Sequence, residues 1–241
     1  MIGLGTIINT AAIVIGGVLG RGCKSLLKER HQETIIKAAG FAIIFMGAAS
    51  TFSKMLVLSD AGKYLSVTGT MNMVLSLALG ALIGELINID ALFERLGEWL
   101  KHKSGSDGDD QFVNSFVTAS LTVCVGAMAI IGSIQDGIYG DYSILTAKAI
   151  LDFVIILIMA ASMGKGCVFS AIPVFVLQGL MTLLAAVLAD LMTDAILNSL
   201  SMVGNILIAC VGVNLIWPKT IRTANLLPAL VVTILISFLP L

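Results

Sequence analysis

Charged side chains are scarce in this chain of 241 residues, at 12% of the sequence against about 25% in soluble domains. Apolar residues take 58%, more than the roughly 45 to 50% that soluble domains use. These proportions exclude a soluble globular protein. They predict an all-α polytopic transmembrane bundle, a single integral membrane domain over residues 1–241 that is surrounded by the lipid bilayer. A net charge of −1 gives no reason to expect nucleic acid as a partner.

Sequence motifs for catalysis are also missing. The only histidines, His31 and His102, lie in polar segments, and neither a His-rich metal signature nor a Gly-x-Ser-x-Gly nucleophile motif occurs. The 4 cysteines lie inside or just after apolar runs and show no disulfide spacing. The sequence therefore predicts no enzyme activity, no metal site and no cofactor.

Prolines number only 4. Pro173 and Pro228 fall near the beginnings of apolar runs, where a helix tolerates proline. Prolines therefore predict no broken helix inside the membrane. Any unwinding is expected at glycines, such as those around Gly126 or Gly164.

The sequence does contain a series of apolar runs, each about long enough to cross a bilayer. They predict about eight spans, or seven if the short last run is not one. The amino terminus lacks the basic region of a signal peptide, so the first run is expected to remain as a helix. The predicted spans are residues 2–19, 38–58, 67–89, 112–134, 143–163, 168–189, 197–216 and 224–241.

The segments between these spans differ in charge. If the amino terminus faces outward, most of the 14 basic residues fall in the inner segments. The positive-inside rule therefore predicts that both termini lie outside. The outer side then collects the acidic residues Asp60, Asp136, Asp141, Asp190 and Asp194.

Two inner segments are predicted to be more than loops. Residues 21–37 are basic and could attract anionic headgroups, although a solvated loop that sets the topology explains them as well. The second segment lies around residues 92–101. Leu92, Leu96 and Trp99 fall on one helical face, which indicates a helix lying in the membrane interface. The Ser- and Gly-rich run 104–110 follows it and predicts a flexible linker. This linker would separate residues 1–103, with three spans and the interfacial helix, from residues 111–241, with five spans.

A faint internal repeat is also present. Leu19-Gly20-Arg21-Gly22-Cys23 closes the first predicted span much as Met163-Gly164-Lys165-Gly166-Cys167 closes the fifth. We therefore predict that spans one to three and spans five to seven are parallel repeats, as in some transporters.

Asp152 is the most informative residue, because it lies at the centre of the apolar run 143–163. An ionised carboxylate at that depth is costly unless it is partnered or hydrated, so Asp152 is either functional or paired. Lys148 lies four residues earlier, on the same helical face. The two residues could form a static salt bridge, or Lys148 could extend to the outer surface and leave Asp152 as a titratable group.

Other polar residues lie near the middle of their predicted spans. Together with Lys148 and Asp152 they are candidates for a site that binds a cation, a proton or a polar solute. The alternative is that the amides only form hydrogen bonds between helices, at roughly 0.6 kcal/mol each. These candidates are Asn9, Thr122, Gln178 and Asn205.

Glycines and polar residues also gather at the outer end of the fourth predicted span. They suggest an outer gate or cation entrance, although a Gly-rich turn explains them as well. The gate candidates are Ser133, Gln135, Asp136 and Asp141.

Small residues recur at spacings that allow close helix packing. Such faces serve packing within one chain and equally permit a homo-oligomer. The glycines concerned are Gly16, Gly20, Gly80, Gly84, Gly126 and Gly132.

Four of these segments, taken as a set, carry a family resemblance: residues 5–10 with Gly16-Gly17, residues 126–137, Lys148 to Asp152, and Gln178-Gly179. Over nearly the whole chain the sequence resembles the YdfK/YqgA family of uncharacterised bacterial inner-membrane proteins, which is defined by a domain of unknown function. The resemblance implies a bacterial plasma (inner) membrane location and a compact bundle sometimes described as a transporter. It supplies no substrate and no catalytic residue.

Two functional hypotheses follow. The leading one is a small secondary transporter or channel-like carrier for an ion or small polar solute, with Asp152 as the cation- or proton-binding group. The alternative is a non-transporting membrane scaffold or regulatory subunit, in which Lys148 and Asp152 form a structural pair and the basic inner segments bind a partner.

Overall fold

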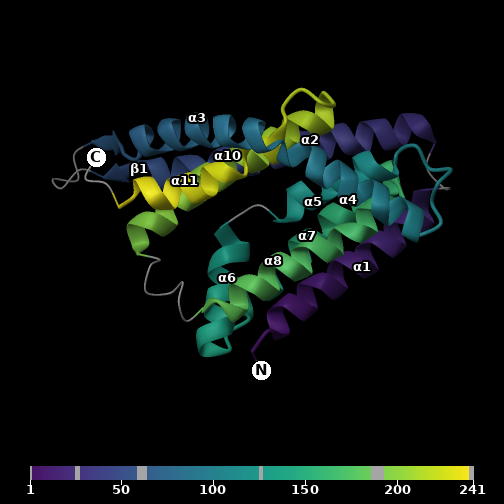
Figure 1. Ribbon diagram of the computed structural model, residues 1–241, viewed down its shortest axis with the longest axis horizontal. Coiled ribbons are helices and arrows are strands. Elements are labelled where there is room, and N and C mark those ends of the chain that lie inside the picture. The colour runs from purple at the N-terminus through teal and green to yellow at the C-terminus, as the bar shows by residue number, and fades with distance from the viewer. Residues whose placement is uncertain (1, 25–27, 59–63, 125–126, 186–192, 239–241) are drawn as a thin grey trace.

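The computed structural model describes residues 2–24, 28–58, 64–124, 127–185 and 193–238, and these are almost entirely helical (Figure 1). The prediction of an all-α polytopic bundle is confirmed. The α-helices are α1 (Leu4–Lys24), α2 (Glu29–Met55), α3 (Thr70–Ile87), α4 (Ile89–Lys103), α5 (Phe112–Cys124), α6 (Ala127–Tyr139), α7 (Ser143–Met163), α8 (Ala171–Leu183), α10 (Asp194–Ile216) and α11 (Pro228–Ile236). Two 3₁₀ helices, η1 (Lys165–Ser170) and η2 (Thr223–Leu226), precede α8 and α11, and the strands β1 (Leu56–Leu58) and β2 (Leu65–Val67) form an antiparallel hairpin.

Within the described residues, six helical segments are long and apolar enough to cross a membrane. They are α1, α2, α3, α7, η1 together with α8, and α10. The α5–α6 pair makes a seventh if it counts as one span. The predicted last span, 224–241, corresponds to the short apolar helix Thr223–Ile236. An eighth span therefore stays a prediction.

The predicted fourth span, 112–134, is not one straight helix. It divides into α5 and α6, whose axes differ by 60°, and α6 continues to Tyr139. Apolar composition places a segment in the membrane but does not require an unbroken helix, and glycine lowers the cost of leaving helical geometry. Gly126, between the two helices, is outside the described residues, as are Asp60 and Asp190.

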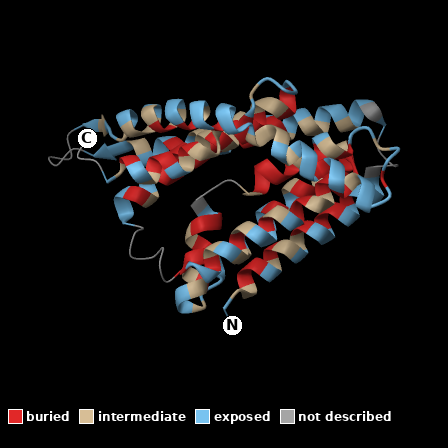
Figure 2. Cartoon of the chain, in the orientation of Figure 1, coloured by how far each residue is buried: buried red, intermediate tan, exposed pale blue. Residues whose placement is uncertain are grey.

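The spans pack in pairs. α1 lies along α7, α2 along α10, and α3 along α11. Each pair joins a span from before the predicted linker 104–110 with one from after it. In Figure 1, α2, α3, α10 and α11 form one layer and α1, α7 and α8 another, with α5 between them. The largest core cluster brings together Ile13, Ile43, Ala119, Val123 and Ile156 from four helices, and buried residues line the facing sides of the layers (Figure 2).

Glycines set the spacing of these pairs. A Cβ at Gly16 would lie 2.7 Å from the Phe153 carbonyl oxygen, and one at Gly20 would overlap the backbone of Leu157. In the other layer, Gly80 lies against α11 and Gly84 against η2, again with no room for a Cβ. Gly132 of α6 lies against the start of α7. Close backbone approach maximises van der Waals contact, which is a main source of helix association in lipid.

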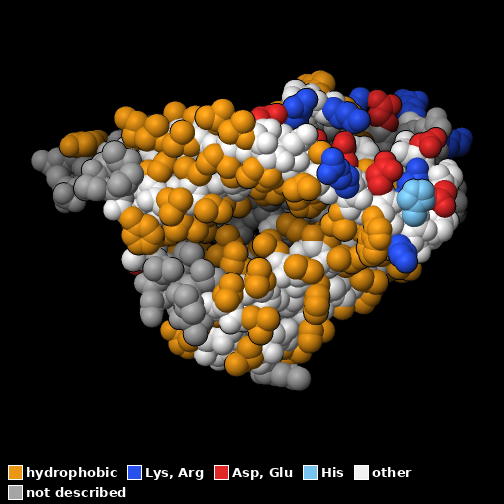
Figure 3. Space-filling model, in the orientation of Figure 1, with side chains coloured by type: hydrophobic (Ala, Val, Ile, Leu, Met, Phe, Trp, Pro, Cys, Tyr) orange, Lys and Arg blue, Asp and Glu red, His pale blue; other side chains and the backbone are white. Residues whose placement is uncertain are grey.

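Charged side chains gather at one end of the molecule, which we call the charged end (Figure 3). It contains α4, the beginning of α2 and the segment after α10. The helix predicted there is present as α4, with acidic Asp90 in its first turn and basic residues in its last; its position in the membrane interface stays a prediction. The described ends of the chain lie away from the charged end (Figure 1). The segment 104–110 is a hydrogen-bonded turn, in which Ser104 Oγ and Ser106 Oγ are 2.7 Å apart.

The internal repeat stays a prediction. Its two matching segments differ in backbone conformation: Gly20 to Cys23 continue α1, whereas Gly164 has φ 103° and ends α7 before η1 begins.

Candidate functional site

Lys148 and Asp152 form a buried ion pair on α7. Lys148 Nζ lies 2.6 Å from Asp152 Oδ2, and the two side chains are only 7% and 5% exposed. The spacing of four residues puts both side chains on one face of the helix. Two charges removed from water lose their hydration, so such a pair needs further hydrogen bonds to be stable.

The second hydrogen bond of Lys148 is made at the end of α5, where the fourth predicted span is broken. Lys148 Nζ donates a hydrogen bond of 2.8 Å to the carbonyl oxygen of Val123, and α5 ends at Cys124. Carbonyls in the last turn of a helix lack intrahelical partners and carry the negative end of the helix dipole. The ammonium group thus occupies a cation position between a carboxylate and a helix end. Cys124 lies close enough to interact electrostatically with both charges.

Asn9 approaches the pair from α1. Its side chain is fully buried and lies beside the Asp152 carboxylate, close enough to interact with it. Neither Asn9 Nδ2 nor Asn9 Oδ1 makes a hydrogen bond of good geometry with the described residues. We therefore treat Asn9 as a neighbour of Asp152 with unused hydrogen-bonding capacity.

The other mid-span candidates do not all join this group. Gln178 is 1% exposed on α8, and its amide also lacks a partner within the described chain. Thr122 Oγ1 donates to the carbonyl oxygen of Thr118 within α5. Asn205 is half-buried on α10 and donates to Ser201 Oγ at 3.3 Å, in the layer that packs on α2.

The residues predicted to form an outer gate lie on α6 and in the segment between α6 and α7. Asp136, which is fully buried on α6, accepts hydrogen bonds from the backbone N–H of Gly3 (3.2 Å) and Gly5 (3.0 Å). A carboxylate there satisfies free donors at the beginning of α1 and complements its dipole. Asp136 therefore connects α6 to α1. Ser133 donates to the Ala129 carbonyl oxygen along α6.

The remaining two gate candidates lie nearer the surface. Asp141 is exposed and accepts a 3.0 Å bond from the backbone N–H of Ser143, at the beginning of α7. Hydrogen bonds from the Ser143 backbone and then its hydroxyl hold the pKa of Asp141 below its ordinary value. Gln135 is half-buried on α6.

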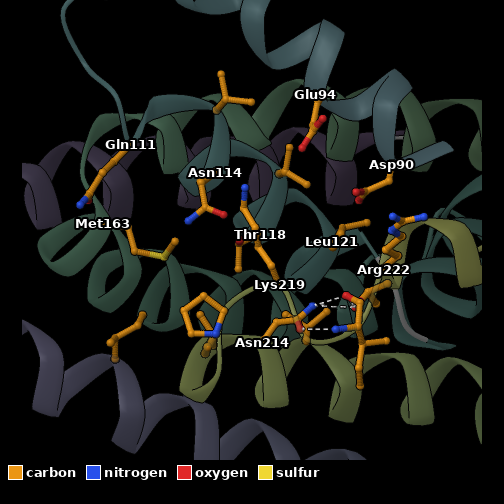
Figure 4. A pocket seen from close by; sticks show the side chains of 18 of the residues that line it. Asp90, Glu94, Gln111, Asn114, Thr118, Leu121, Met163, Asn214, Lys219 and Arg222 are labelled. Atoms are coloured by element: carbon orange, nitrogen blue, oxygen red, sulfur yellow. Dashed lines mark hydrogen bonds between the residues drawn. The ribbon is translucent and has the colours of Figure 1, made fainter. Parts of the chain in front are cut away.

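A large cavity, which sequence reasoning did not predict, lies at the charged end. It has a volume of about 1210 Å³ and is lined by residues of α2, α4, α5, α7, α10 and η2. We call it the vestibule. Asn114 and Thr118 line its α5 side, and Ser162 and Met163 line its α7 side. Figure 4 shows Asn114 and Thr118 of α5 facing the space below Glu94.

The vestibule is predominantly acidic. Asp90, Glu94 and Glu98 are spaced four residues apart and so share one face of α4, and all three line the cavity. Among the described residues no salt bridge involves these three carboxylates. The basic residues of the lining are Lys219 and Arg222, and Arg222 is already paired with Glu85 at 2.9 Å. An acidic cavity of this kind concentrates cations.

Apolar side chains separate the vestibule from the ion pair. Along α7, Asp152 is followed by Ile156 and Met159, both fully buried, before the chain reaches Met163 at the cavity wall. Along α5, Ala119 and Val123 belong to the same core cluster. We call these four residues, Ile156, Met159, Ala119 and Val123, the apolar seal. The vestibule and the buried pair therefore follow one another along the same two helices.

Comparison with known proteins places the chain in a family. A family model described as "Protein of unknown function (DUF554)" matches residues 4–238. The chain belongs to this family. Two relatives are similar over almost their whole length. One is the "Uncharacterized membrane protein YdfK" of Bacillus subtilis (strain 168), 30% identical over 97% of this chain and 95% of that protein. The other is the "Uncharacterized protein YqgA" of Escherichia coli (strain K12), 29% identical over 97% and 96%.

The predicted family is thus confirmed, and the chain is a multi-pass membrane protein in contact with the lipid bilayer. No solved structure matches the chain. The geometry of its own residues must therefore carry any argument about function.

Proposed function

We propose that this protein is a small secondary transporter for a small cation or polar solute, with the Lys148–Asp152 pair as its central gate. The observation that carries the proposal is the position of the pair. It lies deep in the bundle, against the broken end of α5. In many secondary transporters, ions and substrates bind where a helix is interrupted near the middle of the membrane.

Lys148 occupies the position that a transported cation would need. A substrate cation or a proton that neutralises Asp152 would compete with the ammonium group for the carboxylate and leave Lys148 with the Val123 carbonyl alone. Because an unpaired buried charge is unfavourable, release of Lys148 would favour a rearranged state of the bundle. Replacement of Lys148 as the partner of Asp152 is thus the coupling step for alternating access.

The vestibule supplies the entrance. By the positive-inside rule the charged end faces the cytoplasm and both termini face outward, so the vestibule opens inward. Its acidic lining favours cations over anions. The apolar seal between the vestibule and Asp152 then acts as the closed inner barrier of this conformation.

Flux in proteoliposomes tests the proposal. Purified wild type is reconstituted and assayed for uptake of Na⁺, K⁺, ammonium and small amines beside Asp152→Asn. We expect at least one probe to be transported by the wild type and the variant to lose at least 90% of that flux. Asp107→Asn, which changes an exposed carboxylate outside the vestibule, is the matched control. Normal flux through Asp152→Asn, with the protein correctly reconstituted, would sink the proposal.

The complete bonding of the charged pair favours the second candidate, a non-transporting scaffold or regulatory subunit. Both charges are partnered, and the apolar seal separates them from the vestibule. Under this reading the pair serves packing alone. No probe would then cross the membrane, and a charge swap, Lys148→Asp with Asp152→Lys, would recover part of the stability lost in either single variant.

A further inference from the structure

Four polar side chains on α1 and α8 are buried without a hydrogen bond of good geometry to the described chain. Thr6 and Asn9 of α1 are 2% and 0% exposed, and Gln178 and Thr182 of α8 are 1% and 7% exposed. Among the described residues, these four supply six of the eight buried side-chain nitrogen and oxygen atoms that make no hydrogen bond of good geometry. The unsatisfied atoms are therefore concentrated on two helices.

The two helices bring these residues to similar depth. α1 and α8 contact each other, and both contact α6. Gly17 of α1 packs against Val168 of η1. From Val168, the chain advances roughly 16 Å along η1 and α8 to reach Gln178. The distance along α1 from Gly17 to Thr6 is about the same. Gln178 thus lies near the level of Thr6 and Asn9.

Thr182 marks the end of the group that lies farthest from the charged end. Its backbone lies against Gly137 of α6, next to Asp136, which binds the beginning of α1. Asn9 marks the opposite end of the group, beside Asp152. The four side chains therefore extend from the end of the molecule opposite the charged end to the buried ion pair.

The chemistry of these groups favours an uncharged ligand. Carboxamides and hydroxyls offer both donors and acceptors. Lys148 neutralises the carboxylate of Asp152 at one end of the group, and Asp136 at the other end accepts two backbone hydrogen bonds. An amide with no partner in the interior of a membrane protein is costly, so a hydrogen-bonding molecule at these atoms is strongly favoured. Water is the smallest molecule that can satisfy donors and acceptors together.

We propose that Thr6, Asn9, Gln178 and Thr182 bind a chain of water molecules between α1 and α8, which gives protons from outside a route to Asp152. The route rests on the proposed transport function, whereas the hydration does not. A proton arriving from bulk water would bind a carboxylate oxygen of Asp152, and Lys148 would keep only its bond to Val123. Protons would then be the coupling ion, and the vestibule would serve the transported cation.

Few other ionisable groups face Asp152. Lys148 lies on its own helix, and Cys124 approaches from α5. The described part of α8 has no ionisable residue, and those of α1 lie at the charged end. The residue that α2 contributes to the core around Asp152 is the apolar Ile43. The ionisable residue of η1, Lys165, lies beyond the end of α7. Asp136 of α6 lies at the outer end of the group, where it accepts hydrogen bonds from the N–H groups of Gly3 and Gly5. Asp152 is the carboxylate at the inner end, beside Asn9.

Hydroxyl-radical labelling tests the hydration. Radicals made from water by a short X-ray pulse oxidise cysteines that touch bound water, and mass spectrometry locates the product. The reporters are Thr6→Cys and Thr182→Cys. Their matched controls are Ile13→Cys on α1 and Val174→Cys on α8, both at positions 0% exposed in the apolar core.

We expect the two reporters to oxidise at least tenfold faster than the two controls, and Gln178→Leu to slow oxidation of the cysteine at position 182 several-fold. Equal rates at reporters and controls would overturn the proposal. A proton-sensitive dye inside proteoliposomes then tests the route: Gln178→Leu should lower proton uptake coupled to transport at least tenfold, and unchanged coupling would refute it. Labelling needs no flux, so dry reporters in a transporting protein refute only the water chain. Hydrated reporters in a protein without flux refute only the transport function.

Discussion

The ammonium group of Lys148 lies 2.8 Å from the carbonyl oxygen of Val123, at the end of α5. This bond connects the charged pair of α7 to the break in the fourth span. It explains how a lysine can remain at this depth, since its charge is balanced by Asp152 and by the negative end of a helix dipole. The same geometry makes the pair sensitive to any movement of α5 against α7.

Removing one member of the pair should destabilise the protein more than removing both. Lys148→Met leaves Asp152 buried without its counter-charge, and we expect a loss of about 3 to 5 kcal/mol. The double variant Lys148→Met with Asp152→Leu should regain most of this loss, because apolar residues of similar volume replace a buried ion pair at little cost. Unfolding in detergent, read as a double-mutant cycle, measures the coupling. Simple additivity of the two single losses would show that the residues do not interact.

An added methyl group should destabilise the packing of α1 on α7 at Gly20 but not at Gly22. Gly20→Ala places a Cβ onto the backbone of Leu157, and we expect a loss of about 1 to 3 kcal/mol. Gly22→Ala is the matched control, because among the described residues no other segment comes within 4 Å of the Cβ it would add. Thermal unfolding followed by size-exclusion chromatography compares the two. A Gly20→Ala protein as stable as Gly22→Ala would contradict the packing described for this pair.

Charge in the vestibule should act on the affinity for a cation and on its dependence on salt. Glu94→Gln with Glu98→Gln removes two carboxylates from the cavity wall. We expect the KM for a transported cation to rise several-fold with little change in kcat, and the difference to shrink at high ionic strength as charges are screened. Asp107→Asn is the control, because Asp107 is exposed and paired with His102 outside the vestibule. A KM of the double variant equal to that of Asp107→Asn would argue against electrostatic attraction of the cation by α4.

The beginning of α7 should show a pH-dependent contribution from Asp141. Its pKa is held below the ordinary value of 3.8, mainly by the hydrogen bond from the Ser143 backbone. A lowered folded-state pKa stabilises the protein above the unfolded value, and this stability is lost as the pH falls through the folded-state pKa. Asp141→Ala should therefore lower the unfolding temperature at pH 7, and the difference should narrow below about pH 4. A difference that stays constant from pH 7 to pH 3 would show that the ionised carboxylate contributes nothing.

Sequence patterns anticipated the features that depend on one helix at a time. The period of the apolar residues predicted the helix α4, and the spacing of Lys148 and Asp152 put them on one face. The same patterns could not place Asp136, whose role depends on Gly3 and Gly5 more than 130 residues away in the chain. They also missed Asp90, Glu94 and Glu98 as a cavity wall, although their spacing of four residues was visible.

Composition and periodicity alone thus determined that this is a helical membrane protein with a charged pair in the middle of a span, because the bilayer imposes length and apolarity on each helix separately. Tertiary structure decided the partner of that pair, the break in the fourth span and the vestibule. These depend on the register between helices, which is set by glycine contacts such as Gly20 against Leu157 and Gly84 against Asn225. Such contacts depend on shape complementarity between distant segments, which no local pattern specifies.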